Sequence, residues 1–268
     1  MQARIVELIG YRELIRNLVV RDLKVRYKNS VLGILWSLLN PLLMMTVLTV
    51  VFTVMTPSNI PDFPVFVLCG LLPWNFFTAS MTAATGSIVE NAPLVKKVYF
   101  PREVLPLSVV LSNLVNFLIA LVVLFAMIFA FRVRLTAWVL LLPLIILIQV
   151  MFTMGMALFL STLNVFYRDT KIIVEVLMLA WFFVTPIFYP IDKLPHNYVL
   201  WGINIDIWRW VRILNPMASL VAAYRDVLFW GRLVGPDFLL RTFVTALVIL
   251  VAGYWVFLRY SRVFGEEV

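Results

Sequence analysis

Long apolar runs, separated by short polar and basic segments, make up most of this chain. The runs are continuous rather than alternating, which indicates helices and not membrane strands. An α-helix needs about 20 apolar residues to cross a bilayer. The pattern therefore predicts an all-α integral membrane protein with six transmembrane helices, in a domain that covers residues 31–268. The predicted spans are residues 32–55, 65–89, 104–131, 138–164, 172–189 and 241–258.

The first 30 residues follow a different pattern. Apolar residues recur near helical spacing between positions 5 and 23, and two basic pairs, Arg12 with Arg16 and Lys24 with Lys28, stand four apart. Residues four apart share one face of a helix. Residues 1–30 therefore predict a basic amphipathic helix that lies in the cytoplasmic surface of the membrane. The alternative is a plain soluble tail.

The stretch between the fifth and sixth predicted spans, residues 191–236, combines apolar patches with charged residues. Charges are costly at the centre of a bilayer, so this stretch is not expected to cross it. Asn215 followed by Pro216 is typical of a helix N-cap and first helical residue. Pro186 and Pro190 would break the helix before it. We expect short re-entrant helices on the outer side here; the alternative is an ordinary outer loop.

Composition strengthens the membrane prediction and orients it. Hydrophobic residues make up 63% of the 268 and charged residues 13%, with a mean hydropathy of +1.00. The net charge of +8 comes from basic residues between apolar runs, which does not indicate a nucleic-acid surface. Of the 22 Lys and Arg residues, 14 lie on the side of the N-terminal segment, against Arg132 and Arg134 in the short loop after the third span. Both termini are therefore predicted to be cytoplasmic.

The residues that carry chemistry are few. The single cysteine, Cys69, cannot form an intrachain disulfide, and the single histidine, His196, has no partners for a metal site. The chain lacks a phosphate-binding loop for ATP. Almost no ionisable residue lies within the six spans. Glu175, near the cytoplasmic end, is the sole candidate for the charged group that ion-driven transporters need inside the membrane. We expect no enzyme activity and no cofactor in this chain, and energy supplied by a partner.

Neutral polar residues do occur inside the predicted spans. They could line a transport path, or they could hydrogen-bond between helices, which is their more ordinary use. These residues are Asn75, Thr78, Ser80, Thr82, Asn113, Asn116 and Gln149.

Five segments, in order along nearly the whole chain, carry a family resemblance. They are residues 21–41, which open Arg-Asp-Leu-Lys-Val-Arg-Tyr-Lys, 70–77 (Gly-Leu-Leu-Pro-Trp-Asn-Phe-Phe), 163–169 (Leu-Asn-Val-Phe-Tyr-Arg-Asp), 185–189 (Thr-Pro-Ile-Phe-Tyr) and 214–216 (Leu-Asn-Pro). Together they resemble the ABC-2 type permeases for polysaccharide export, which are the membrane subunits of O-antigen, capsule and teichoic acid exporters.

The resemblance implies an assembly and a division of labour. Two copies would pair to form one channel, and two ATPase subunits carrying ATP and Mg would dock below. The segment 91–101 would be the main coupling helix, with an apolar contact surface flanked by lysines; the alternative is an inner loop anchored by snorkelling lysines. The implied coupling residues are Asn91, Pro93, Leu94, Val95, Lys96, Lys97, Val98, Tyr99 and Phe100, and those of the interface helix are Arg21, Asp22, Lys24, Arg26, Tyr27 and Lys28.

The resemblance also suggests a path and a gate. The first and fifth spans are expected to line the channel through Trp36, Asn40, Trp181 and Tyr189. The outer gate region is expected to hold Asn215, Pro216, Tyr224 and Arg225.

The function that follows is the permease subunit of an exporter in the bacterial plasma (inner) membrane. Its cargo would be lipid-linked polysaccharide, with O-antigen as the first candidate and teichoic acid or capsule as the next. Membrane lipids would also contact the chain. One rival is a membrane enzyme acting on lipid-linked sugars, for which Asp192, Asp206 and Asp226 are thin support. Another rival is an ABC-2 exporter of drugs or small lipids.

Overall fold

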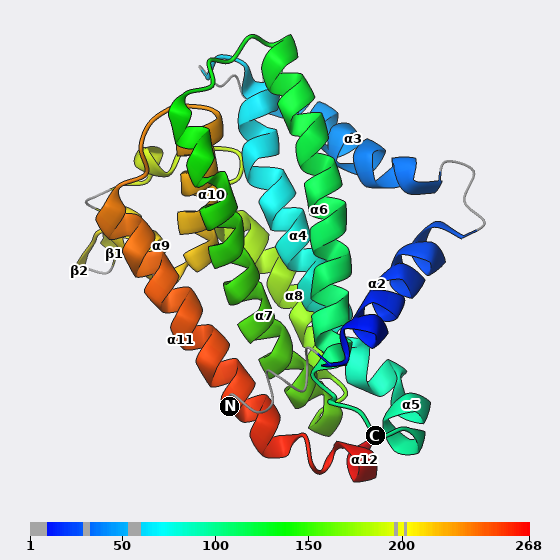
Figure 1. The fold of residues 1–268 in the computed structure, drawn as a ribbon. Helices are drawn as coiled ribbons and strands as arrows, with labels where there is room; N and C mark the ends of the chain where they lie inside the picture. Colours follow the sequence, from blue (N-terminus) through cyan, green and yellow to red (C-terminus); the bar gives the residue numbers. More distant parts are fainter. Residues whose placement is uncertain (1–9, 29–32, 53–59, 196–197, 201–202) are drawn as a thin grey trace.

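A computed structural model describes residues 10–28, 33–52, 60–195, 198–200 and 203–268 (Figure 1). Within these ranges the regular secondary structure is helical apart from one short two-stranded ribbon. His196, the start of the predicted interface helix and both ends of the first predicted span lie outside the described residues.

Four long apolar helices confirm four of the predicted spans. Each is long and apolar enough to cross a membrane. The sixth predicted span begins earlier than expected, because Pro236 occupies the first turn of its helix. The four are α4 (Phe63–Glu90), α6 (Val104–Ala130), η3 and α7 together (Ala137–Leu141 and Leu142–Phe166), and α11 (Pro236–Tyr260).

The first and fifth predicted spans coincide with shorter helices. These are α3 (Trp36–Val50), preceded by the 3-10 turn η1 (Gly33–Leu35), and α8 (Thr170–Val184). Each has 15 residues, which is about 22 Å of helix. The prediction that the fifth helix reaches residue 189 is wrong. Thr185 is extended (φ −87°, ψ 130°), as expected before the ring of Pro186, and the helix ends there.

The predicted amphipathic helix is α2 (Arg12–Tyr27). Leu18 is buried, and the partly buried Leu14 and Ile15 pack with it against the base of the bundle. The basic residues Arg12, Arg16, Arg21 and Lys24 are exposed. Helix α2 therefore packs one apolar side on the protein, while Val20 and Val25 are exposed; its place in the cytoplasmic surface of the membrane stays a prediction.

Helix α4 is the centre of the bundle. Most of its side chains are buried, and it contacts α3, α6, α7, α8 and α10. Helices α7 and α11 approach closely at Gly155 and Gly253; a Cβ on Gly155 would lie 2.6 Å from the backbone carbonyl carbon of Ile249. Small residues of this kind let membrane helices pack backbone to backbone.

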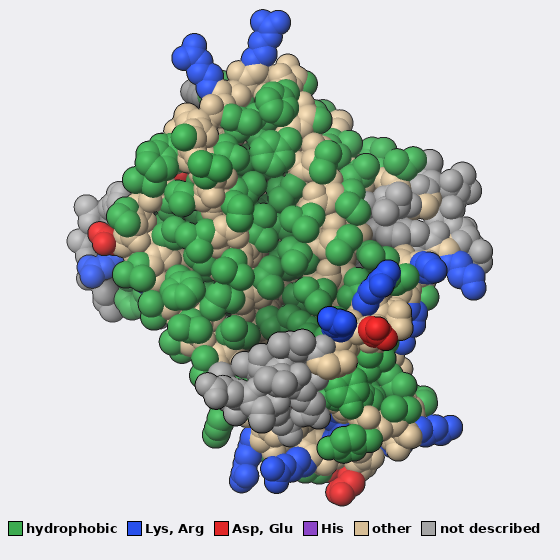
Figure 2. All heavy atoms as spheres, viewed as in Figure 1, with side chains coloured by type: hydrophobic (Ala, Val, Ile, Leu, Met, Phe, Trp, Pro, Cys, Tyr) green, Lys and Arg blue, Asp and Glu red, His purple; other side chains and the backbone are tan. Residues whose placement is uncertain are grey.

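The two ends of the bundle differ. The short helices α5 (Ala92–Lys97) and α12 (Phe264–Glu267) lie together at one end, beside the start of α2 (Figure 1). The connection from α6 to α7, with the exposed Arg132 and Arg134, lies at the other end. Figure 2 shows an apolar surface across the middle of one face, with Lys and Arg above and below it. This band is what a membrane-embedded surface requires.

Between α8 and α11 the chain forms short elements. These are the 3-10 turn η4 (Ile191–Lys193), the antiparallel strands β1 (Tyr198–Leu200) and β2 (Ile203–Ile205), and the helices α9 (Ile207–Leu214) and α10 (Pro216–Leu228). Short helices were expected here, and α9 and α10 are present; that they are re-entrant on the outer side stays a prediction. The ribbon was not expected and is the one departure from an all-helical fold among the described residues. Helix α10 is almost wholly buried against α4 and α7.

Candidate functional site

Asn215 joins the start of α10 to the end of α8. Its Oδ1 accepts hydrogen bonds from the Ala218 backbone N–H (3.1 Å) and from Trp181 Nε1 (2.9 Å). Its Nδ2 donates to Thr185 Oγ1 at 3.1 Å. With Pro216 in the first turn, the predicted N-cap is confirmed. One buried amide thus both caps a helix and ties it to a second helix.

Arg225 lies one residue beyond Tyr224 on α10, and its side chain is 3% exposed. The guanidinium donates to the backbone carbonyl oxygens of Phe66 (3.3 Å), Pro186 (2.5 Å) and Tyr189 (3.1 Å), and also to that of Ile187. Its carbon lies 3.6 Å from the centre of the Phe66 ring, as in a cation–π contact. The described partners of this buried cation are carbonyls and a ring rather than a carboxylate.

The local sequence explains why these carbonyls are free to accept. The backbone after Val184 is not helical, so the carbonyls of residues 186–189 have no helical donor and need another. Room for the guanidinium comes from Gly70 on α4, where a Cβ would lie 2.9 Å from Arg225 Nη2. Three segments of the family resemblance, around residues 70, 185–189 and 215, therefore meet at one place.

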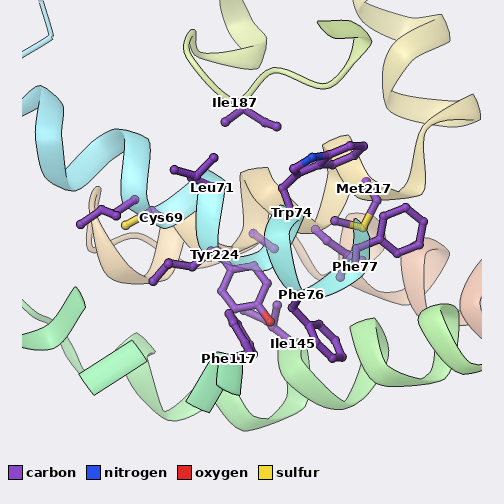
Figure 3. Packing of buried hydrophobic residues seen from close by; sticks show 14 of the residues in the cluster. Cys69, Leu71, Trp74, Phe76, Phe77, Phe117, Ile145, Ile187, Met217 and Tyr224 are labelled. Atoms are coloured by element: carbon purple, nitrogen blue, oxygen red, sulfur yellow. The ribbon is translucent and has the colours of Figure 1, made fainter. Parts of the chain in front are cut away.

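Tyr224 extends this junction to α7. Its side chain is fully buried, and its hydroxyl donates to Gln149 Oε1 at 2.7 Å. Gln149 Nε2 in turn donates to the carbonyl oxygen of Pro73 on α4, also at 2.7 Å. Figure 3 shows the Tyr224 ring beside Phe117, an edge-to-face pair with centroids 6.0 Å apart. The Gln149 side chain thus hydrogen-bonds between helices and links α7 to α4 and α10.

We call this junction the α8–α10 clasp. It consists of Gln149, Trp181, Thr185, Asn215, Tyr224 and Arg225. The clasp includes three of the four residues predicted for an outer gate, namely Asn215, Tyr224 and Arg225. It holds α4, α7, α8 and α10 through hydrogen bonds that all end on protein atoms.

The residues predicted to line a channel fall into two places. Trp181 lies in the clasp, with its ring centroid 5.3 Å from that of Phe77, and Tyr189 lends its carbonyl to Arg225. Trp36 and Asn40 instead line a separate cavity of about 580 Å³ between α3, α4 and α6.

The coupling segment has an inner and an outer side. Tyr99 is 92% exposed, and Val98 is about half exposed. Val95 and Phe100 are buried in a cluster with Leu18 from α2. The expectation that Val95 and Phe100 offer an apolar surface to a partner is therefore wrong, because both anchor the segment to the bundle. The exposed side consists of Pro93, Lys96, Lys97, Val98 and Tyr99.

Two polar contacts tie the coupling segment to neighbouring helices. Arg21 on α2 donates to Asn91 Oδ1 at 3.3 Å. Lys171, at the start of α8, donates to Glu90 at the end of α4 with an N–O distance of 2.7 Å. This hydrogen bond and the Glu90 charge raise the pKa of the Lys171 ammonium. A shift of α5 would therefore be felt by α2, α4 and α8.

The acidic residues that a membrane enzyme would need have structural partners. Asp206 caps α9 by accepting from the Arg209 backbone N–H at 2.9 Å. Asp226 accepts from Arg232 Nε at 2.6 Å, and burial raises the pKa of its carboxyl group while that hydrogen bond opposes the rise. Among the described residues, no three His, Cys, Asp or Glu side chains gather into a metal site.

Comparison with known proteins identifies the family that has this architecture. The family model for ABC-2 type transporters matches residues 13–229. The chain belongs to the ABC-2 type transporter family. An O-antigen export system permease protein RfbA of Myxococcus xanthus is 37% identical over 262 residues, 98% of each chain. One from Klebsiella pneumoniae is 34% identical over 92% of this chain and 91% of its own. The polysialic acid transport protein KpsM of Escherichia coli is 23% identical over 80% of each.

Sequence reasoning missed the burial of Arg225 in this ABC-2 transporter. A signal was available in the helix itself. Arg225 shares a face of α10 with Val221 and Leu228, four residues before and three after it, and both are buried. An arginine on an apolar helix face needs partners inside the protein.

Proposed function

We propose that this chain is the membrane permease subunit of an ATP-driven exporter of lipid-linked polysaccharide, with O-antigen as the first candidate cargo and teichoic acid or capsule next. Membership in the ABC-2 type family, together with full-length likeness to relatives named as O-antigen export permeases, carries this proposal. The more distant likeness to a polysialic acid transport protein supports polysaccharide over drugs or small lipids.

The proposed assembly is a homodimer in the bacterial inner membrane with cytoplasmic termini. Helices α3 and α8 would complete six crossings with the segments that flank them. Helix α8 supports this arrangement because one side of it exposes large apolar residues, among them Ile172, Val176 and Phe183. Such a side suits lipid or a second copy of the chain. The basic end with α5 and α12 would face the cytoplasm.

Two ATPase subunits, which would carry the ATP and Mg, are proposed to dock on the exposed side of α5. Val98 and Tyr99, which directly follow α5, supply an apolar contact there, and the exposed Lys96 and Lys97 can meet acidic groups. Val95 fixes α5 to the base of the bundle, so a push on α5 would reach α4 and its neighbours. ATP binding and hydrolysis would then shift the bundle between two helix arrangements.

The proposed outcome of that shift is opening at the α8–α10 clasp. The clasp holds the end of α8 and the start of α10 by a few directed hydrogen bonds on non-helical backbone. The hydrogen bonds of such a junction are either formed or broken, which gives it the two discrete states that a gate needs. The glycan would pass at the dimer centre while its lipid end slips between helices.

A first experiment tests the cargo. Deleting the chain from its host should abolish long polysaccharide at the cell surface and leave lipid-linked polysaccharide inside, and a plasmid copy should restore export. Unchanged surface polysaccharide in the deletion strain would falsify the proposed function. Glycosyl or phosphoryl transfer by the purified chain without any ATPase would favour the enzyme instead.

A second experiment tests the docking surface. Val98→Asp with Tyr99→Asp should leave the protein folded, because both side chains are exposed. ATPase stimulation and export should both be lost. Tyr198→Asp on the β1–β2 ribbon, also an exposed tyrosine, is the matched control and should keep both. Normal stimulation in the α5 variant would remove the coupling role from this surface.

A further inference from the structure

Two arginines from different helices gather around one aromatic ring near the start of α11. Arg212, in the last turn of α9, has its guanidinium carbon 4.3 Å from the centre of the Phe238 ring and 4.6 Å from that of Trp208. Arg241, in the second turn of α11, has its guanidinium carbon 5.5 Å from the centre of the same Phe238 ring. Its Nη2 donates to the Arg212 carbonyl oxygen at 2.9 Å. We call these two residues the α9–α11 arginine pair.

The acidic residues near the pair are engaged by a third arginine. Arg232 Nε donates to Asp226 at 2.6 Å, and Arg232 Nη2 lies 3.9 Å from Asp192 Oδ2. Asp237 stands four residues before Arg241 on α11, but the two form no ion pair among the described contacts. Within the described part of the chain, the arginine pair therefore has no carboxylate at ion-pair distance.

The pair has donors to offer and charge to neutralise. Burial lowers the pKa of the Arg212 guanidinium, and the charge of Arg241 lowers it further, while Asp192 and Asp226 oppose the change. The Arg212 guanidinium donates no hydrogen bond to the described residues, and Arg241 uses one of its five N–H donors on the Arg212 carbonyl. Both side chains are partly exposed, so a ligand can reach them. An anion with several acceptor oxygens would offset the repulsion and accept from both guanidiniums.

An exposed apolar stripe continues from Arg241 along α11. Residues at helical spacing after Arg241 lie on the same side of the helix, and each is about half exposed or more. The stripe is about 21 Å long, which exceeds the hydrocarbon thickness of one leaflet, about 15 Å. It consists of Val244, Val248, Val251 and Trp255. A ligand with an anionic head and hydrocarbon chains fits the pair and the stripe together.

The position of the pair in the bundle suits a lipid headgroup. Thr136, in the connection from α6 to α7, donates to the Gly231 carbonyl oxygen at 3.0 Å, so the chain enters α11 at the end opposite to α5 and α12. Helix α9 also carries Trp208 and Trp210. Tryptophan is enriched at the headgroup level of membranes, where lipid phosphates lie.

We infer that the α9–α11 arginine pair binds the phosphate of a lipid headgroup, whose acyl chains lie along the α11 stripe. The phosphate oxygens accept hydrogen bonds from both guanidiniums, and the rings of Phe238 and Trp208 hold the two cations in place. Free phosphate shares the anionic chemistry, but it makes no use of the stripe. The inference goes beyond the proposed function, because a lipid site of this kind is independent of the cargo.

The test is a lipid titration of the purified full chain in an uncharged detergent, with bound lipid counted by native mass spectrometry. The probe is dioctanoyl phosphatidylglycerol. Dioctanoyl glycerol has the same chains without phosphate, and inorganic phosphate has the anion without chains. Phosphatidylglycerol should bind saturably, one per chain, and each of the other two should bind at least about tenfold more weakly, since each lacks one half of the interaction.

Four variants locate the bound phosphate. Arg212→Met and Arg241→Met should each weaken phosphatidylglycerol binding about tenfold, as expected for the loss of one charge-assisted hydrogen bond. Arg212→Lys keeps the charge but loses the planar fork, so it should weaken binding about threefold, and it serves if Arg212→Met does not fold. Phe238→Leu should also weaken binding about threefold without removing a charge.

Arg134→Met is the matched control. Arg134 is an exposed arginine at the same end of the bundle, so its loss removes the same charge and should leave the affinity for phosphatidylglycerol unchanged.

Four results would overturn the site. No saturable binding of phosphatidylglycerol would remove it outright, and equal binding of dioctanoyl glycerol would mean that the chains alone bind. Equal binding of inorganic phosphate would mean a free-anion site instead of a lipid site. Wild-type affinity in both Met variants of the pair, or an equal loss in Arg134→Met, would mean attraction to the overall positive charge. Each of these results would leave the proposed export function standing.

Discussion

The two sides of α4 use similar side chains in opposite ways. On the side of the α8–α10 clasp, Asn215 and Gln149 have both amide atoms bonded to protein. On the cavity side, Asn113 leaves Oδ1 without a partner in the described residues. Both settings are buried and both include large aromatic rings. The two sides therefore differ in how far the amides are hydrogen-bonded: completely on the clasp side, and only through Nδ2 at Asn113.

This contrast gives a rule for reading neutral polar residues in membrane helices. A fully bonded amide between helices stabilises one arrangement and makes it specific. An incompletely bonded buried amide lowers stability, because one of its polar atoms has lost water without gaining a partner. Polar composition alone does not separate the two uses, whereas the partner of each atom does.

The largest effect is expected at Arg225. Arg225→Met removes a guanidinium that serves four backbone carbonyls, and should lower the free energy of unfolding by about 3 kcal/mol or more. Arg225→Lys keeps the charge but reaches fewer carbonyls, so its loss should be smaller. Thermal unfolding in detergent measures both.

Arg232→Met is the control for the loss of an arginine. Arg232 is largely exposed, but the Asp226 carboxylate that it bonds is 15% exposed, so its removal should cost about 1–2 kcal/mol, less than at Arg225. Wild-type stability in Arg225→Met would show that the clasp does not hold α8 to α10.

The sharpest comparison is one substitution made on both sides. Asn215→Leu removes a helix cap and two interhelical bonds, and should cost about 2 kcal/mol. Asn113→Leu removes a half-bonded amide, and should leave the stability within about 0.5 kcal/mol or raise it. The two sites are 5% and 2% exposed, so burial is matched. Equal losses in unfolding experiments would contradict the distinction.

A smaller effect is expected within the Tyr224–Gln149 pair. Tyr224→Phe should cost about 1 kcal/mol, because it leaves Gln149 Oε1 without its donor. In the Gln149→Leu variant, Tyr224→Phe should cost much less, since the acceptor of the Tyr224 hydroxyl is already absent. A double-mutant cycle should therefore give a coupling energy of about 1 kcal/mol. Strict additivity would mean that this bond does not link α7 to α10.

Much of the helical layout was predictable from the sequence. Helices α4, α6 and α7 match their predicted spans within a few residues, because long apolar runs leave few alternatives. The cap at Asn215 was predictable because the Asn-Pro pair has a local meaning. The end of α8 was placed too late because Phe188 and Tyr189 prolong the apolar run after the break before Pro186. The strands of the ribbon have three residues each, too few for an alternating signal.

The site itself was predictable only in pieces. Gly70, Thr185 and Asn215 were recognisable in separate segments, and their meeting depends on how α4, α8 and α10 pack. Arg225 was predicted as part of an outer gate region, but its burial was not predicted. Its partners are backbone carbonyls far along the chain, which composition does not reveal. In the coupling segment, the apolar run did not distinguish the buried Val95 from the exposed Val98.

The smallest effect is expected at the exposed ion pair of Lys171 and Glu90, whose side chains are 41% and 56% exposed. Lys171→Met should cost less than about 1 kcal/mol, and less still in high salt. Glu90 raises the pKa of Lys171, so the contribution is complete below the unfolded pKa of about 10.4 and is lost as the pH rises through the higher folded value. Unfolding curves of wild type and variant should therefore converge in strong alkali. A stability difference between wild type and variant that widens in strong alkali would contradict this expected pH dependence. Water can take the place of either partner in an exposed ion pair, so such a pair adds little to stability. Hydrogen bonds therefore matter more for stability in the buried clasp than at Lys171 and Glu90.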